Sequence, residues 1–134
     1  MRKAYDVTEL VMPDVIYLCG GNTFSILNKT RETKLDKFII DQVKSGSVYV
    51  GVSAGSIIAG PSIEIAGWGS EVDKNEVGLK EINGFNFVDF SVFPHFHEEL
   101  RNEVEDFKKQ VNYRVFELTN EQAMFVENEY FTIL

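Results

Sequence analysis

The chain has 134 residues, of which 44% are hydrophobic, so it is long enough for one domain with a substantial core. Its formal net charge of −8 argues against nucleic acid as a partner, because binding phosphates requires clustered lysine and arginine. It has no apolar run of about eighteen residues, which predicts no membrane contact, and its first six residues lack the apolar core of a signal peptide.

The first predicted element is a buried strand over residues 15–19, which runs directly into two glycines and two polar residues. Gly20 and Gly21 permit unusual backbone conformations and let a ligand approach the chain closely. Asn22 and Thr23 suit the N-cap of a helix. This loop is therefore either a simple turn from strand to helix or a backbone site for a substrate or an oxyanion.

Cys19 is the only cysteine in the chain. Its place at the end of an apolar strand predicts a small, buried hydrophobic side chain. A lone cysteine cannot form an intrachain disulfide, which fits a reducing compartment, and we expect a cytoplasmic protein.

Apolar residues recur along residues 34–44 at the spacing of an amphipathic helix, and a second apolar strand follows over residues 48–52. A strand, a helix and a strand in this order predict two parallel neighbouring strands. Ligands of open α/β sheets bind beyond the carboxyl ends of such strands. The Gly20–Gly21 loop and Ser53 both lie at such an end.

Residues 48–60 read V-Y-V-G-V-S-A-G-S-I-I-A-G and organise the rest of the chain. Gly51, Ser53 and Gly55 fit the G-x-S-x-G pattern of a nucleophile elbow, in which a serine stands on a sharp turn between a strand and a helix. Small neighbours let strand and helix approach closely, and the amide of Ala54 can donate to an oxyanion. The alternative is an ordinary serine N-cap after a buried strand.

A long irregular loop over residues 61–80 carries several carboxylates, and a strand over residues 88–93 follows it. His95 and His97, the only histidines, come just after this strand, where a general base for Ser53 belongs. The spacing H-x-H also suggests a metal pair. With no further histidine and one cysteine, a zinc site would need carboxylates, so we predict neither metal nor cofactor.

The rest of the chain predicts a helix over residues 97–111, a strand over residues 115–118, and a hairpin formed by residues 123–126 and 130–134. The sequence therefore predicts a single α/β domain over residues 1–134. We expect a three-layer αβα arrangement with a mostly parallel sheet and a C-terminal β-hairpin.

Three short motifs in this order resemble the peptidase E group of serine peptidases, which is the S51 peptidase family and includes aspartyl dipeptidases and cyanophycinases. V-I-Y-L-C-G-G-N-T resembles the strand and oxyanion loop of the family, G-V-S-A-G-S-I-I-A-G its nucleophile elbow, and F-P-H-F its histidine segment. The resemblance covers nearly the whole chain.

The resemblance implies Ser53 as the nucleophile and His95 as the general base. It implies that the backbone amides of Gly21 and Ala54 form the oxyanion hole. It further implies amide hydrolysis through an acyl-enzyme.

The third catalytic residue of the family is acidic and lies between the serine and the histidine. Glu71 stands where cyanophycinase-like members carry a glutamate. The aspartate of the dipeptidase-like members corresponds to a position nearer Trp68, allowing for gaps. Asp73 is therefore the alternative candidate for the acidic residue.

Substrate binding is expected at Gly20, Asn22 and Thr23, in the loop after the first strand. The family's arginines that bind an acidic side chain have no clear match. Arg101 is the nearest candidate for holding a substrate carboxylate, and it can equally be a solvated cation on the helix.

Family members carry an additional N-terminal segment, whereas here thirteen residues precede Asp14. The chain therefore resembles a short version of the family, with a strand edge that a homodimer would cover. The leading prediction is a serine peptidase of the dipeptidase or exopeptidase type. Two alternatives are a weakly active or inactive domain that acts by association, and an esterase with the same Ser–His chemistry.

Overall fold

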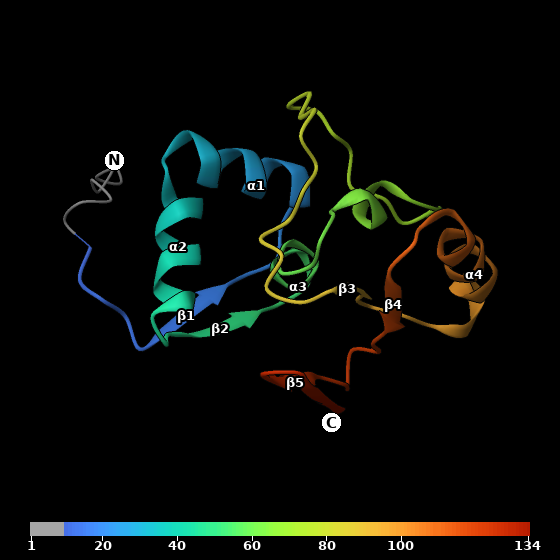
Figure 1. The fold of residues 1–134 in the computed structure, drawn as a ribbon. Coiled ribbons are helices and arrows are strands. Elements are labelled where there is room, and N and C mark those ends of the chain that lie inside the picture. The colour runs from blue at the N-terminus through green and yellow to red at the C-terminus, as the bar shows by residue number, and fades with distance from the viewer. Residues whose placement is uncertain (1–9) are drawn as a thin grey trace.

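The computed structural model describes residues 10–134, which form four α-helices, two short 3-10 helices and six strands (Figure 1). Residues 1–6, where the sequence shows no signal-peptide core, lie outside the described residues. In chain order the elements are β1 Val15–Leu18, α1 Thr23–Glu32, α2 Leu35–Lys44, β2 Val48–Gly51, α3 Ala54–Ile58, η2 Glu64–Gly67, β3 Phe90–Phe93, η3 Glu98–Leu100, α4 Arg101–Gln110, β4 Arg114–Glu117, β5 Met124–Glu127 and β6 Tyr130–Ile133.

The N-terminal half is the predicted unit of two parallel strands joined by helix. β1 pairs with β2 in parallel, from Val15 opposite Val48 to Leu18 opposite Gly51. The connection holds two helices, since Lys34, with φ of 60°, takes a left-handed conformation that separates α1 from α2. The sequence predicted a helix N-cap at Asn22 or Thr23; Asn22 is the N-cap, and α1 buries its apolar residues Phe24 and Leu27.

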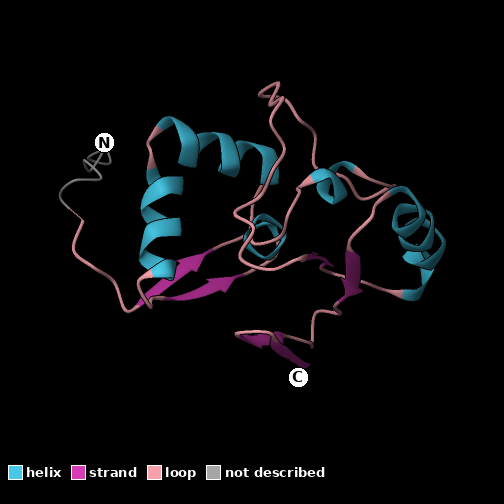
Figure 2. Ribbon diagram, in the orientation of Figure 1, coloured by secondary structure: helices cyan, strands magenta, loops and turns pink. Residues whose placement is uncertain are grey.

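Helices α1 and α2 cover one face of β1 and β2, as Figures 1 and 2 show. Ile16, Leu18 and Tyr49 point to this face and pack against the main core. Successive side chains of a strand alternate between the two faces. Val15 and Val48, which are opposite each other in the register, therefore lie on the other face and are 55% and 58% exposed.

The C-terminal half contains a second parallel pair, β3 with β4, and an antiparallel hairpin, β5 with β6. The fold is therefore α/β, with the mostly parallel pairing and the C-terminal hairpin that the sequence predicts. Among residues 10–134 the strands form three separate two-stranded ladders. α3 packs between β2 and β3, and the backbone amides of residues 85–87 donate to the carbonyls of residues 58–60. Within the described residues, the ladder of β1 and β2 is therefore not joined to the ladder of β3 and β4 by hydrogen bonds between strands.

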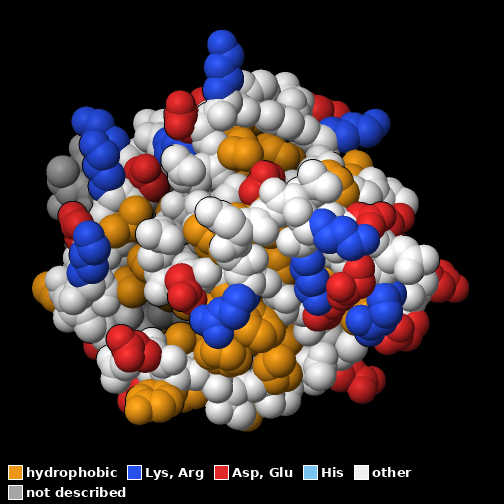
Figure 3. All heavy atoms as spheres, turned by 45° about the vertical axis from the view of Figure 1, so that its right-hand side comes forward, with side chains coloured by type: hydrophobic (Ala, Val, Ile, Leu, Met, Phe, Trp, Pro, Cys, Tyr) orange, Lys and Arg blue, Asp and Glu red, His pale blue; other side chains and the backbone are white. Residues whose placement is uncertain are grey.

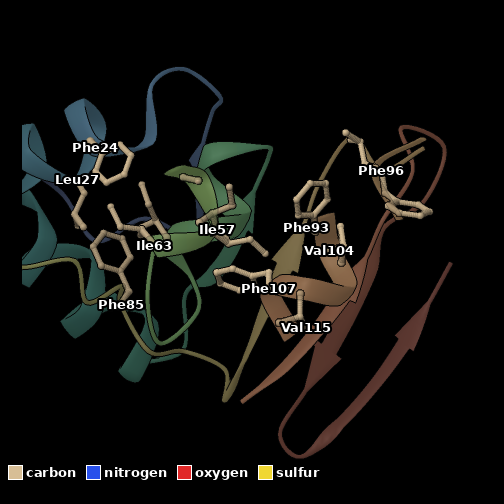
Figure 4. Close-up of a cluster of buried hydrophobic side chains, with 14 of the residues drawn as sticks. Phe24, Leu27, Ile57, Ile63, Phe85, Phe93, Phe96, Val104, Phe107 and Val115 are labelled. Carbon is tan, nitrogen blue, oxygen red and sulfur yellow. The ribbon is translucent and has the colours of Figure 1, made fainter. Parts of the chain in front are cut away.

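The main core lies between the helices and the two parallel pairs (Figure 4). Phe107, Val104 and Phe93 come from the C-terminal half, and Leu27 and Ile57 come from the N-terminal half. The two halves therefore share one apolar interior, which fixes the ends of their strands relative to one another.

The outer surface mixes charges of both signs, with hydrophobic side chains grouped between them on the face shown in Figure 3. On α4 the charges form pairs three residues apart, such as Lys108 with Glu105 and Lys109 with Asp106. No helix within the described residues is long and apolar enough to cross a membrane. Cys19 is exposed, so the predicted burial of its side chain is wrong: β1 ends one residue earlier, at Leu18, and the thiol follows the strand end.

Candidate active site

Ser53 stands on a strained turn between β2 and α3, as the elbow pattern predicts. Its φ of 53° and ψ of −112° lie outside the regions that ordinary side chains prefer. A non-glycine residue in such a backbone conformation lowers the stability of the fold, and residues of this kind concentrate at functional sites. The turn ends β2 at Gly51 and begins α3 at Ala54, so the serine is presented at the strand end.

Close packing beneath the turn explains the small residues on either side of Ser53. A Cβ on Gly51 would come within 2.5 Å of the carbonyl oxygen of Gly55, and a Cβ on Gly55 would overlap the carbonyl oxygen of Leu18. The hydroxyl of Tyr49 donates to the Gly55 carbonyl at 2.7 Å. Burial raises the pKa of Tyr49, so this hydroxyl keeps its proton and its donor role at neutral pH.

His95 reaches the elbow from the C-terminal half of the chain. Its Nε2 lies 2.8 Å from the Ser53 Oγ, although the two residues are 42 positions apart. The backbone of His95 is left-handed, with φ of 59°. The amide of Phe96 donates to the carbonyl of Leu118 at 3.0 Å, and the amide of Leu118 donates to the carbonyl of Phe93 at 3.0 Å, which anchors the histidine turn to the end of β4.

The other ring nitrogen of His95, Nδ1, lies 2.6 Å from the Oδ1 of Asn120. The third residue of the constellation is therefore an amide that the sequence did not single out. One signal could have found it: β3 and β4 are parallel neighbours, and residues just past their carboxyl ends must meet at one edge. His95 follows β3 by two positions, and Asn120 follows β4 by three.

Neither carboxylate predicted for this role contacts His95, which corrects the sequence-based assignment. Glu71 Oε1 lies 3.2 Å from Nε2 of His97. Asp73 Oδ2 accepts from the amide of Thr23 at 2.8 Å and from its hydroxyl at 2.6 Å. The loop that carries both carboxylates folds over the start of α1 and toward η3, and so presents them to other partners.

A pocket of about 110 Å³ opens beside Ser53 and His95. Its lining includes Gly21, which the sequence predicted for the oxyanion hole, and both carboxylates of the loop. The complete set is Gly21, Thr23, Ser53, Ile57, Ile65, Ala66, Glu71, Asp73, Phe93, Pro94 and His95. Ala54, the second predicted oxyanion residue, is buried as the first residue of α3.

The other residues of the predicted substrate loop have mainly structural contacts. A Cβ on Gly20 would lie 3.3 Å from the Cβ of Ser53, so this position keeps the loop close to the nucleophile. Asn22 caps α1 by accepting from the amide of Ser25 at 2.9 Å, and its side-chain amide donates to the carbonyl of Lys74 at 2.9 Å. Asn22 thus ties the carboxylate loop to the start of α1.

Arg101 does not line the pocket. Its guanidinium donates twice to Glu98, at 2.7 Å each, and lies over the ring of Phe96 at 4.8 Å from the centroid. The hydrogen bond from Arg101 lowers the pKa of Glu98. The interpretation of Arg101 as a cation on the helix surface therefore fits the structure better than a substrate contact. Among residues 10–134, no group of three His, Cys, Asp or Glu side chains is arranged to hold a metal ion.

Comparison with known proteins settles the family. The model of peptidase family S51 matches residues 1–134. The chain belongs to peptidase family S51. The resemblance noted in the sequence is thereby confirmed.

Relatives support the same assignment. The chain is 32% identical over 126 residues to the uncharacterized peptidase Lmo0363 of Listeria monocytogenes, a match that covers 91% of this chain and 60% of that protein. It is 32% identical over 102 residues to peptidase E of Salmonella paratyphi A, covering 74% of this chain and 41% of that one. The chain therefore spans about three-fifths, or less, of the S51 relatives it matches.

A solved structure shows the same fold. A crystal structure of a Listeria monocytogenes protein, provisionally described as peptidase E, superposes with a TM-score of 0.76 at 30% identity. The match covers 90% of this chain and 59% of that one. The α/β architecture of this S51 chain is therefore that of a peptidase E structure.

Proposed function

We propose that this S51 chain is a serine peptidase that hydrolyses short peptides through an acyl-enzyme on Ser53. The observation that carries the proposal is the 2.8 Å contact between Ser53 Oγ, on a strained elbow, and His95 Nε2. A nucleophile within hydrogen-bond reach of a base, which is itself oriented by a third group, is the arrangement that activates a serine.

The proposed reaction has two proton-transfer stages. His95 Nε2 takes the proton of Ser53 as Oγ attacks the peptide carbonyl carbon, and the tetrahedral oxyanion is stabilised by the backbone amides of Gly21 and Ala54. The imidazolium then gives its proton to the leaving amine, and the acyl-enzyme remains. Water, deprotonated by His95, attacks the acyl carbon and releases the acid with Ser53 restored.

The pocket favours a small substrate side chain that carries no carboxylate. Its volume of about 110 Å³ suits a small side chain or an amino group rather than a long residue. Glu71 and Asp73 line it, and its lining contains no lysine or arginine. We therefore expect neutral or amino-bearing dipeptides to be cleaved more readily than aspartyl dipeptides, because two carboxylates repel a third.

The test is hydrolysis of a panel of dipeptides by the parent, Ser53→Ala and the control Ser45→Ala. Ser45 is an exposed residue after α2, so its loss leaves the elbow intact. We expect Ser53→Ala to lower kcat by at least about 1,000-fold and the control to match the parent. Equal turnover by Ser53→Ala and the parent would end the proposal.

The same panel separates the alternatives that the sequence left open. Hydrolysis of a p-nitrophenyl acyl ester with no dipeptide cleavage would replace the peptidase with an esterase. No turnover of either substrate, in a folded protein, would favour the inactive domain that acts by association.

A further inference from the structure

His95 is held on its far side by an amide, and we propose that Asn120 positions its imidazole for proton transfer without supplying a negative charge. This inference rests on the proposed function, since it concerns the base of the same reaction. It assigns to Asn120 a role that the family resemblance gave to a carboxylate, Glu71 or Asp73.

The contacts leave one partner for each ring nitrogen of His95. Nε2 meets Ser53 Oγ at 2.8 Å, and Nδ1 meets Asn120 Oδ1 at 2.6 Å. The two carboxylates of the pocket are bonded elsewhere, Glu71 to His97 and Asp73 to Thr23.

The chain fixes Asn120 relative to His95 through backbone hydrogen bonds. Thr119, the residue before it, donates its amide to the side chain of Gln122 at 3.0 Å and accepts from the Gln122 amide at 3.2 Å, which closes a tight turn. The residue before that, Leu118, is bonded through its amide and its carbonyl to the segment that carries His95. These bonds therefore hold the Asn120 turn against the segment that carries His95.

The amide oxygen decides which nitrogen of the ring carries the proton. A carbonyl oxygen only accepts, so Asn120 Oδ1 requires a proton on Nδ1, which leaves the Nε2 lone pair facing the Ser53 hydroxyl. When Nε2 takes the serine proton, Nδ1 keeps its own proton and its bond to Asn120. The amide thus orients the ring and selects the productive tautomer, as in Cys–His–Asn proteases.

What the amide lacks is the charge that would stabilise the imidazolium. A carboxylate at the same position would accept the same hydrogen bond and add an attraction for the protonated ring. The parent enzyme is therefore expected to be slower than its own Asn120→Asp variant. When activity is measured against pH, the loss of activity on the acid side should come at a higher pH for Asn120→Asp than for the parent. Glu71 and Asp73, the other ionisable groups of the pocket, are the same in both proteins.

The test compares the parent with Asn120→Ala, Asn120→Asp and the control Asn102→Ala. Asn120 and Asn102 are both exposed, so neither exchange empties the core. The readouts are the tautomer of His95 from long-range proton–nitrogen NMR spectra, the rate of fluorophosphonate labelling of Ser53, and kcat and KM for a cleaved dipeptide. His97, whose ring meets Glu71, provides an internal reference in the spectra.

We expect the parent to carry the His95 proton on Nδ1 and Asn120→Ala to mix the two tautomers. Labelling and kcat should fall about 10- to 100-fold in Asn120→Ala with KM within about 3-fold, since general-base catalysis is worth about 100- to 10,000-fold. Asn120→Asp should exceed the parent rate, and Asn102→Ala should match it.

The proposal is overturned if the parent carries the proton on Nε2, or if Asn120→Ala keeps the parental tautomer and rate. Failure of the peptidase proposal looks different. In that case no protein in the series labels or turns over, while the His95 tautomer still responds to Asn120→Ala and the positioning role stands.

Discussion

His95 and His97 are two positions apart, yet the structure gives them different partners. His95 faces the nucleophile and an amide, whereas His97 faces Glu71 across an exposed contact of 3.2 Å. The backbone of His95 is left-handed, so its ring leaves the chain in a different direction from the ring of His97. One residue of the H-x-H motif therefore serves the site, and the other serves the loop above it.

Glu71→Gln tests this division directly. We expect kcat for dipeptide hydrolysis to stay within about 3-fold of the parent, because an exposed pair such as Glu71–His97 is worth at most about 1 kcal/mol. His95→Ala, assayed beside it, should lose at least about 1,000-fold. A comparable loss in Glu71→Gln would return Glu71 to the catalytic constellation.

The residues of the site differ in how far the sequence could reveal them. Ser53 was predictable because its elbow needs small neighbours at fixed spacing, and His95 because histidine is rare in this chain and follows a strand. Asn120 was not predictable, because its position beside His95 depends on which strand pairs with β3. Asparagine is also common in ordinary turns, so its residue type gave no signal. The family resemblance also implies a carboxylate between Ser53 and His95 in the chain, whereas Asn120 is an amide and follows both.

At the scale of the elements, α1 begins at a buried residue that depends on the carboxylate loop. Thr23 is fully buried and donates both its amide and its hydroxyl to Asp73. The first amides of a helix have no partner within the helix, so this carboxylate satisfies a donor that would otherwise be orphaned. The loop is thus part of the support of α1 as well as a wall of the pocket.

Asp73→Ala should therefore lower the free energy of unfolding by about 1–3 kcal/mol, since it leaves two donors of a buried residue without a partner. Urea unfolding at neutral pH measures the change. Asp41→Ala, an exposed exchange on α2, should change it by no more than about 0.5 kcal/mol. Equal effects of the two exchanges would show that the Thr23 contacts contribute nothing to stability.

Tyr49 supports the elbow from below, so Tyr49→Phe should cost about 1–2 kcal/mol of unfolding free energy at pH 7. Burial raises the pKa of Tyr49, whereas an unfolded tyrosine ionises near pH 10. The contribution of the Tyr49 hydroxyl to the free energy of unfolding is fully present below about pH 10 and is lost as the pH rises above it. The difference between parent and variant should therefore shrink by about 1 kcal/mol at pH 10.5 in urea unfolding. A difference that is equal at both pH values would contradict the account.

At the scale of the whole molecule, the described residues form α/β ladders around one core but leave a strand face uncovered. Val15 and Val48 lie opposite each other on that face and are more than half exposed. Continuous apolar runs, such as residues 15–19 and 48–52, are typical of strands that are buried on both faces, which favours a three-layer arrangement. The β1–β2 pairing and the C-terminal hairpin were predictable from short spacings, whereas the β3–β4 pairing and the separation of the ladders depend on tertiary packing, such as that of α3 against β3.

Replacing both exposed residues, Val15→Thr and Val48→Thr, should change the free energy of unfolding by no more than about 0.5 kcal/mol per site. It should also reduce association at high concentration, because large exposed apolar patches drive proteins together. Light scattering and urea unfolding measure the two effects. Ile16→Thr, on the core side of the same strand, is the matched control and should cost more than about 1 kcal/mol. An equal loss of stability from both faces would contradict the assignment of the faces.

The measurement that tests the central claim most directly is labelling of Ser53 by a fluorophosphonate, with the modified residue located by mass spectrometry. The probe reacts with a serine whose proton is taken up by a neighbouring base, so it reports the Ser53–His95 pair before any substrate is known. We predict labelling at Ser53 in the parent, none in Ser53→Ala, and a rate at least about 100-fold lower in His95→Ala. Labelling of Ser53 at the parental rate in His95→Ala, or no labelling of the folded parent, would contradict the account.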